Sequence, residues 1–529
     1  MSALTGTGAL ARLVVRRDRL ILPLWGLPAA LYPSSIAGST AGLYPTAEAL
    51  RGVGDAAMAN PSQTAMRGPV FEASVGGLTA HTVTSSGGML LGLVSMLLVI
   101  RHSRGEEESG RRELVAAGVV GRHAPLTAAL AVVLAANVVI AVLMAGALTG
   151  VGLPASGSFA LALSLAAAGW TFAAVGALAA QLTESVAAAR GMGIGVFAVF
   201  FLIRAVGDAG GVAWLSWASP LGWTLGVRPF AGERWWVFAL LLTLTVALAG
   251  TAYRLSSRRD LAAGMLPARL GPVVAAPGLR SAPALAWRLH RGQLVAWIAG
   301  FAAGGLALGG AVSGGIEGQI DAPQIMEMIA RVGGGDAKPA DFFVNYLLSM
   351  LAWIIAAYGI LSALRLRTEE TAGRADLVLV TPTSRIRWAL SHLFMAVVAP
   401  AAAMVALGAA TGLVYSTRGG DLDKFPLVLG AALAYLPAVW VMTGIAVLLV
   451  GLLPRLSMAA WGIWVAFILL DVLGTLGQVD GSVLNIIPFV HVPWIILGQT
   501  AVAPLLLMTV VAIALGATGL AALRRRDIA

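Results

Sequence analysis

Apolar runs of roughly 20 residues recur along the chain, and they constrain its fold more than any other feature. The run "LALSLAAAGWTFAAVGALAA", at 161–180, is one example. Runs of this length cross a bilayer as helices, whereas β-barrel strands alternate apolar and polar residues over about ten positions. Hydrophobic residues make up 58% of the 529 residues and the mean hydropathy is +0.86, which is more apolar surface than a soluble core could bury. The sequence therefore predicts an all-α polytopic membrane protein.

The apolar runs fall into two groups of six, so the sequence predicts about 12 membrane spans. The first group lies at about 20–43, 84–101, 124–150, 157–181, 187–206 and 235–254. The second group lies at about 292–313, 342–364, 388–415, 426–453, 458–477 and 499–522. Between the groups, residues 255–287 carry spaced prolines that are typical of a linker, namely Pro267, Pro272, Pro277 and Pro283. We therefore divide the chain into a first half (1–254), a cytoplasmic linker (255–287) and a second half (288–529).

The distribution of basic residues indicates the orientation of the spans. With both termini on one side, most arginines lie in the loops of that side, whereas Lys338 and Lys424 lie on the other. Basic residues in short loops mark the cytoplasm, so both termini are expected inside a bacterial plasma (inner) membrane. The formal net charge of +10 is then a topology signal rather than a sign of a nucleic-acid partner. We expect the arginine-rich ends to contact anionic membrane lipids.

A charged stretch after the second span is repeated in the second half. "RGEEESGRRELV" at 104–115 aligns without gaps with "RTEETAGRADLV" at 367–378. A second pair, "SRRDLA" at 257–262 and "RRRDIA" at 524–529, follows the sixth span of each half. Self-similarity of this kind indicates a tandem repeat. Because six is an even number, both halves enter the membrane in the same direction, and a pseudo-two-fold axis along the membrane normal is expected between them.

The spacing of charges in the repeat predicts one short helix between the second and third spans of each half. Its expected ion pairs, four residues apart, are Arg104–Glu108, Glu107–Arg111, Glu108–Arg112 and Glu370–Arg374. Two interpretations remain open at this point. A solvated loop helix would carry such charges for topology alone. A docking helix needs a fixed spacing, and a duplicated docking helix would serve a partner with two equivalent sites.

Four stretches resemble one family of transporters. They are "ARLVVRRDRL" (11–20), "NPSQTAMRGP" (60–69), the repeated "EExxGRxEL" pattern and "SPLGW" (219–223). Over nearly its whole length the chain resembles ABC exporter permeases, in particular the fused two-half actinobacterial drug or polyketide-antibiotic efflux permeases. The second half departs from the pattern, because "IIPFVHVPW" (486–494) replaces "SPLGW".

The resemblance implies that 104–122 and 367–385 are coupling helices seated on two copies of a cytoplasmic ABC ATPase. The residues that this assigns to coupling are Glu106, Glu107, Gly110, Arg111, Glu113, Glu369, Glu370, Gly373, Arg374 and Asp376. Independently, a phosphate-binding loop needs GxxxxGK[ST], and the chain's two lysines precede Pro339 and Phe425. The chain should therefore hold no cofactor, with ATP and Mg²⁺ on the partner subunit.

Further candidate residues concern an outer gate. The "SPLGW" region, with Pro220 and Trp223, and its replacement around Pro488 are expected either to form the gate or to be proline-capped interfacial loops. Two charges late in equivalent spans, Arg204 and Asp471, either pair across the halves or reach outer water separately.

Aromatic residues in the spans are candidates for an apolar substrate pathway, although such residues more often face lipid or pack against neighbouring helices. They are Phe197, Phe200, Phe201, Trp353 and Phe467. The six histidines show no metal-ligand spacing, so no metal site is expected.

The leading hypothesis is the permease subunit of an ATP-driven exporter of hydrophobic or amphipathic compounds, without enzymatic activity of its own. The alternative is an ion-gradient-driven secondary transporter, which can also have two six-span halves. No acidic residue falls at the centre of a predicted span, where a proton relay would be expected, and this favours the first hypothesis. A membrane-embedded transferase or a scaffold fits the pattern less well.

Overall fold

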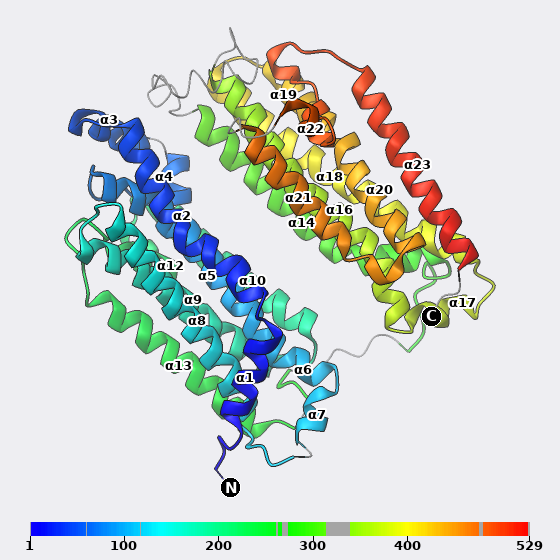
Figure 1. Ribbon diagram of the computed structural model, residues 1–529, viewed down its shortest axis with the longest axis horizontal. Coiled ribbons are helices and arrows are strands. Elements are labelled where there is room, and N and C mark those ends of the chain that lie inside the picture. The colour runs from blue at the N-terminus through cyan, green and yellow to red at the C-terminus, as the bar shows by residue number, and fades with distance from the viewer. Residues whose placement is uncertain are drawn as a thin grey trace. The chain divides into compact units, whose positions relative to one another are not determined.

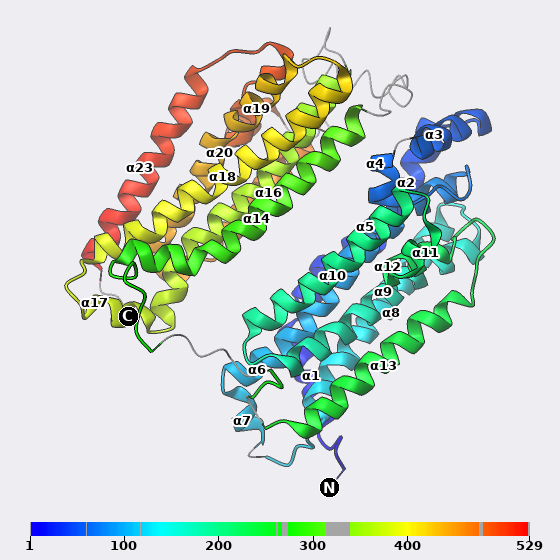
Figure 2. The same ribbon diagram turned by 180° about the vertical axis from the view of Figure 1, so that it is seen from behind.

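The computed structural model describes residues 2–59, 61–116, 118–260, 263–266, 273–313, 339–475 and 480–526. Within these ranges the chain forms helices and connecting turns, without β-strands. It divides into two compact units, Met1–Gly271 and Pro272–Ala529, here called unit 1 and unit 2 (Figures 1 and 2). The division falls inside 255–287, although helices extend into that segment from both sides.

Unit 1 is a bundle of long helices with short helices at both ends (Figure 1). Its helices are α1 (Thr7–Arg17), α2 (Ile21–Leu43), α3 (Ala47–Ala59), α4 (Pro61–Arg67), α5 (Val75–His102), α6 (Arg104–Glu108), α7 (Arg111–Ala116), α8 (Ala124–Gly150), α9 (Ala155–Leu182), α10 (Val186–Ala209), α11 (Ala213–Trp217), α12 (Pro220–Gly226) and α13 (Val237–Arg258). Helix α9 is the most deeply buried of the span helices and contacts α5, α8, α10 and α13. Its many alanines, glycines and serines allow this close packing.

Unit 2 repeats the order of the long helices. Its elements are α14 (Ala282–Ser313), α16 (Pro339–Thr371), α17 (Arg374–Leu379), α18 (Arg385–Gly419), α19 (Lys424–Ala434), α20 (Leu436–Leu452), η2 (Pro454–Leu456), α21 (Ala459–Thr475), α22 (Gly481–Leu484), η3 (Pro488–His491), η4 (Ile495–Leu497) and α23 (Ala503–Arg525). The two units share a similar hydrogen bond between long helices. The indole of Trp170 donates to the Leu134 carbonyl, and that of Trp440 donates to the Val397 carbonyl, both at 3.2 Å.

The number of spans differs from the prediction. Among the described residues, ten helices are long and apolar enough to cross a membrane, and the expected first span is the bent pair α1 and α2, with an angle of 76°. The expected eleventh span is α21, which has only 17 residues. Length and composition therefore support ten or eleven of the twelve spans.

The positions of α20 and α23 nevertheless indicate that α21 leads from one end of unit 2 toward the other. Helices α20 and α23 are parallel, since Gly444 lies against Ala512 and Gly451 lies against Gly519. Both helices end near the same end of the unit, so the chain between them has to return. Helix α21 makes that return (Figure 1).

Candidate functional site

The repeated charged segments form a compact structure, here called the elbow, at 104–116 in unit 1 and 367–379 in unit 2. The expected single helix is broken by glycine in both. Gly110, with φ 71°, separates α6 from α7, and Gly373, with φ 67°, separates α16 from α17. Glycine adopts this left-handed conformation without the steric penalty of a Cβ. The break displaces the ion pairs that were predicted four residues apart, and the side chains pair differently.

The first glutamate of each elbow is bound by the arginine that follows the glycine. The Arg111 guanidinium donates to Glu106 at 2.9 and 3.2 Å, and the Arg374 guanidinium donates to Glu369 at 2.7 and 3.2 Å. These hydrogen bonds raise the pKa of Arg111 and of Arg374. In unit 1, Arg17 of α1 also donates to Glu106, at 2.6 Å. The glycine turn therefore closes each elbow on itself.

The second glutamate of each elbow is buried and holds the last long helix of its unit. Glu107 accepts two hydrogen bonds from Arg259, at 2.8 and 2.9 Å, just after α13. Glu370 accepts two from Arg526, at 2.7 and 2.8 Å, just after α23. Paired hydrogen bonds between charged groups are among the strongest in proteins. Arg259 and Arg526 are the equivalent residues of "SRRDLA" and "RRRDIA", so this clamp is duplicated.

Further arginines surround the same carboxylates. Glu107 also contacts Arg104, at 2.8 Å, and Arg112, and Glu370 contacts Arg367 at 3.0 Å. Burial lowers the pKa of Arg112 to about 10, and repulsion from neighbouring arginines adds to this effect.

In each unit, an arginine at or just before the start of the third long helix, α8 or α18, donates hydrogen bonds to the backbone of the clamp. Arg122 donates to the carbonyls of Ser256 and Arg259, at 3.1 and 2.9 Å, and its repeat equivalent Arg385 donates to the Arg526 carbonyl at 2.8 Å. Sequence reasoning missed Arg259 and Arg526 as site residues, although the second repeated motif contained the signal.

Only some of the predicted coupling residues are exposed on the surface of the elbows. Arg111 and Glu113 are exposed in unit 1, and Gly373, Arg374 and Asp376 are exposed in unit 2. In unit 2, Leu377 and Val380 are also 75% and 88% exposed. These residues remain free to contact a partner, whereas Glu107 and Glu370 lie inside their units.

The chain is similar over its whole length to a multidrug efflux permease. The multidrug efflux system permease protein Rv1217c of Mycobacterium tuberculosis (strain ATCC 25618 / H37Rv) is 40% identical over 535 residues, which cover 100% of this chain and 96% of that protein. The chain belongs to this permease family. The sequence model described as "Multidrug efflux system permease Rv1217c, C-terminal domain" matches residues 279–524. Together with the long apolar helices, this membership makes the chain a multi-pass membrane protein.

The two candidate gate charges have partners within their own units. Arg204 donates to Asp208 at 3.1 Å and to the carbonyls of Ala65 and Met66 at 2.8 and 3.2 Å. It thereby holds α4, which is the helix of the "NPSQTAMRGP" motif. Asp471 accepts from the Trp353 indole at 3.1 Å. The pairing of Arg204 with Asp471 across the halves stays a prediction.

The prolines and Trp223 of the candidate gate lie in short helices, and a role in gating stays a prediction. Pro220 begins α12, and the Trp223 indole donates to the Trp217 carbonyl at 2.7 Å. Pro488 begins η3, where the next residue, Phe489, stacks on Trp353 with ring centroids 3.7 Å apart.

The candidate pathway residues lie mostly in packed cores. Phe197 is buried against Phe172, with ring centroids 4.7 Å apart, and Phe200 and Phe201 pack partly buried in the same cluster. In unit 2, Trp353 is buried and Phe467 is partly buried against the main cluster. A role in substrate passage stays a prediction for all five.

Proposed function

We propose that this chain is the membrane permease subunit of an ATP-driven, ABC-type exporter in the bacterial plasma membrane. Its cargo would be hydrophobic or amphipathic compounds, such as drugs, antibiotics or lipid-like molecules, moved out of the cell. The relative named a multidrug efflux permease supports the efflux role. ATP hydrolysis would take place on two copies of a separate cytoplasmic ABC ATPase.

The observation that carries this proposal is the duplicated clamp at the elbows. Each elbow follows directly on the second long helix of its unit, α5 or α16. Through Glu107 with Arg259, and Glu370 with Arg526, it also holds the last long helix. A force applied to the outward face of one elbow would therefore reach several spans at once. Two such elbows are suited to two equivalent motor subunits.

The motor is assigned to another chain because these 529 residues contain no GxxxxGK[ST] motif. Lys424 contacts Asp341, at 2.7 Å, and Lys338 lies outside the described residues. The arginine-rich elbow ends would face the cytoplasm, where the ATPase and its ATP and Mg²⁺ are available.

The test separates docking from folding. We would co-express the chain with the ATPase encoded beside it, purify the complex into lipid nanodiscs and measure bound ATPase and ATP turnover. The variant Glu113→Arg with Asp376→Arg changes only exposed charges of the elbows. We expect it to lose the ATPase while its thermal unfolding is unchanged. The control, Glu48→Arg with Asp423→Arg, reverses two exposed acids at the other ends of the units and should retain the ATPase.

A different result would favour the alternative function. If no ATPase binds the wild-type chain, and an ion gradient drives substrate uptake into vesicles, the chain is a secondary transporter. Retention of the ATPase by the elbow variant would show that docking uses another surface.

A further inference from the structure

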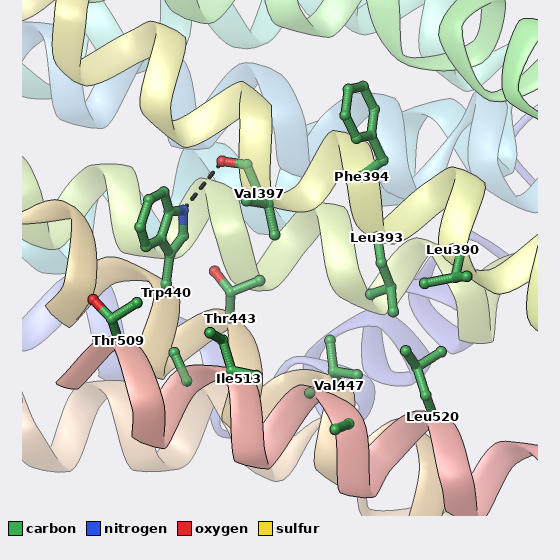
Figure 3. Close-up of a pocket in the computed structure, with 14 residues that line it drawn as sticks. Leu390, Leu393, Phe394, Val397, Trp440, Thr443, Val447, Thr509, Ile513 and Leu520 are labelled. Carbon is green, nitrogen blue, oxygen red and sulfur yellow. Dashed lines mark hydrogen bonds between the residues drawn. The ribbon is translucent and has the colours of Figure 1, made fainter. Parts of the chain in front are cut away.

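Unit 2 contains an apolar pocket of about 660 Å³ between α18, α20 and α23 (Figure 3). Leu390 and Leu393 point from α18 toward Leu520 of α23, and Trp440 of α20 lies toward the other end (Figure 3). The few polar groups in the wall are already bonded. Trp440 donates to the Val397 carbonyl, and the hydroxyls of Thr443 and Thr509 donate to carbonyls one turn earlier in their own helices. An occupant would therefore meet apolar surface.

A second pocket, of about 520 Å³, shares Leu390 and Phe394 with the first, so the two form one groove. Its other lining residues include Trp287 of α14 and Ser384 and Arg387 at the start of α18. The groove thus leads from the arginine-rich end of the unit into the bundle. Tryptophan at such a depth is typical of the membrane–water interface.

The mouth of the groove carries an arginine without a carboxylate partner among the described residues. Arg387, in the first turn of α18, lines the second pocket and is exposed. Its guanidinium is therefore available to a negatively charged group at the elbow end of the groove.

Unit 1 fills the corresponding position with a tyrosine. Under the repeat, Leu390 and Leu520 correspond to Thr127 and Tyr253. The Tyr253 hydroxyl lies 2.8 Å from the Thr127 hydroxyl, and its ring lies edge-on to His123 with centroids 5.4 Å apart. The tyrosine ring bridges α8 and α13, whereas the two leucines leave space. The Tyr253 contact thus closes in unit 1 the position that is open in unit 2.

We propose that this groove binds one anionic phospholipid from the leaflet on the elbow side. Its phosphate would lie at Arg387, and one acyl chain would lie between α18, α20 and α23. From Ser384 to Val397 the groove runs about 20 Å along α18 at 1.5 Å per residue. This length compares with half of a hydrocarbon core of roughly 30 Å plus the headgroup level. Charge at the mouth and apolar walls below match the two ends of such a lipid.

The first experiment tests the charged mouth. The full-length chain is purified without an ATPase, delipidated, and titrated with phosphatidylglycerol or phosphatidylcholine, and bound lipid is counted by native mass spectrometry. We expect preferential phosphatidylglycerol binding. Arg387→Gln should weaken it about fivefold, the effect of one basic residue near an anionic headgroup. Arg418→Gln, at the opposite end of α18, is the control and should bind as wild type. Equal binding of both lipids by the wild type, or unchanged binding by Arg387→Gln, would overturn the proposal.

The second experiment tests the apolar part. A Cβ at Gly516 would meet no atom within 4 Å, so Gly516→Leu adds a side chain to the groove wall without a clash at Cβ. We expect this variant to lose bound lipid, while Gly430→Leu, an equally open glycine of α19, retains it. Loss of a bound hydrophobic drug with retention of lipid would instead make the groove a cargo site and refute the lipid assignment. Because no ATPase is present, the outcome is independent of the exporter proposal.

Discussion

Glu107 is the residue on which the unit 1 elbow depends. Its carboxylate is buried and contacts Arg104, Arg112 and Arg259. We predict that Glu107→Gln lowers the free energy of unfolding by about 3 kcal/mol or more, because removing one partner leaves buried charges uncompensated. Thermal or denaturant unfolding in detergent measures this. The exposed Glu113→Gln should unfold as wild type, and equal stability of the two variants would contradict the clamp.

The same residues show what sequence alone could reach. The identities between the two charged repeats located both glutamates correctly as a duplicated feature. The sequence did not indicate that they point inward, because their partners Arg259 and Arg526 are 152 and 156 residues away. A contact at that separation leaves no local pattern. Only the second repeated motif, which contains Arg259 and Arg526, indicated that this segment and the elbow are related.

At the scale of elements, the glycine turn decides the shape of the elbow. We predict that Gly373→Ala lowers the free energy of unfolding by about 1 kcal/mol, because an alanine at φ 67° is strained. Gly105→Ala is the matched control. Its Cβ would make only ordinary contacts at 3.8 Å, and alanine favours the α6 helix, so stability should hold or rise. Circular dichroism melts of both variants measure the difference, and equal losses would contradict this account of the turn.

The boundaries of the long helices show a second limit of sequence reasoning. Hydropathy placed the start of the second span at 84, whereas α5 begins at Val75. The extra turns contain Thr79 and His81, which are buried against the rest of unit 1 rather than exposed to lipid. Hydropathy detects contact with lipid and overlooks polar residues inside a bundle. Similarly, the charge spacing predicted one continuous helix in each elbow. A single glycine in the left-handed conformation breaks that helix into two.

At the scale of the whole molecule, the role of α21 can be tested directly because the sequence contains no cysteine. We predict that Arg455→Cys and Ser482→Cys, which flank α21 at exposed positions, react with an impermeant maleimide from opposite sides of the membrane. Ser281→Cys and Asp421→Cys are references for the elbow end and the far end of unit 2. Labelling of both flanking positions from one side would make α21 a re-entrant segment and leave unit 2 with an odd number of crossings.

The long sequence separation of the clamp residues also sets an order of events during protein synthesis. When the ribosome has made the unit 1 elbow, Glu107 has only its local arginines, and Arg259 is still 152 residues from being translated. The elbow can close only after four further long helices have been made. The same holds for Glu370, whose partner follows 156 residues later. Each unit thus completes its elbow end last. A nascent chain that stalls before its final helix would expose an unclosed elbow to cellular quality control.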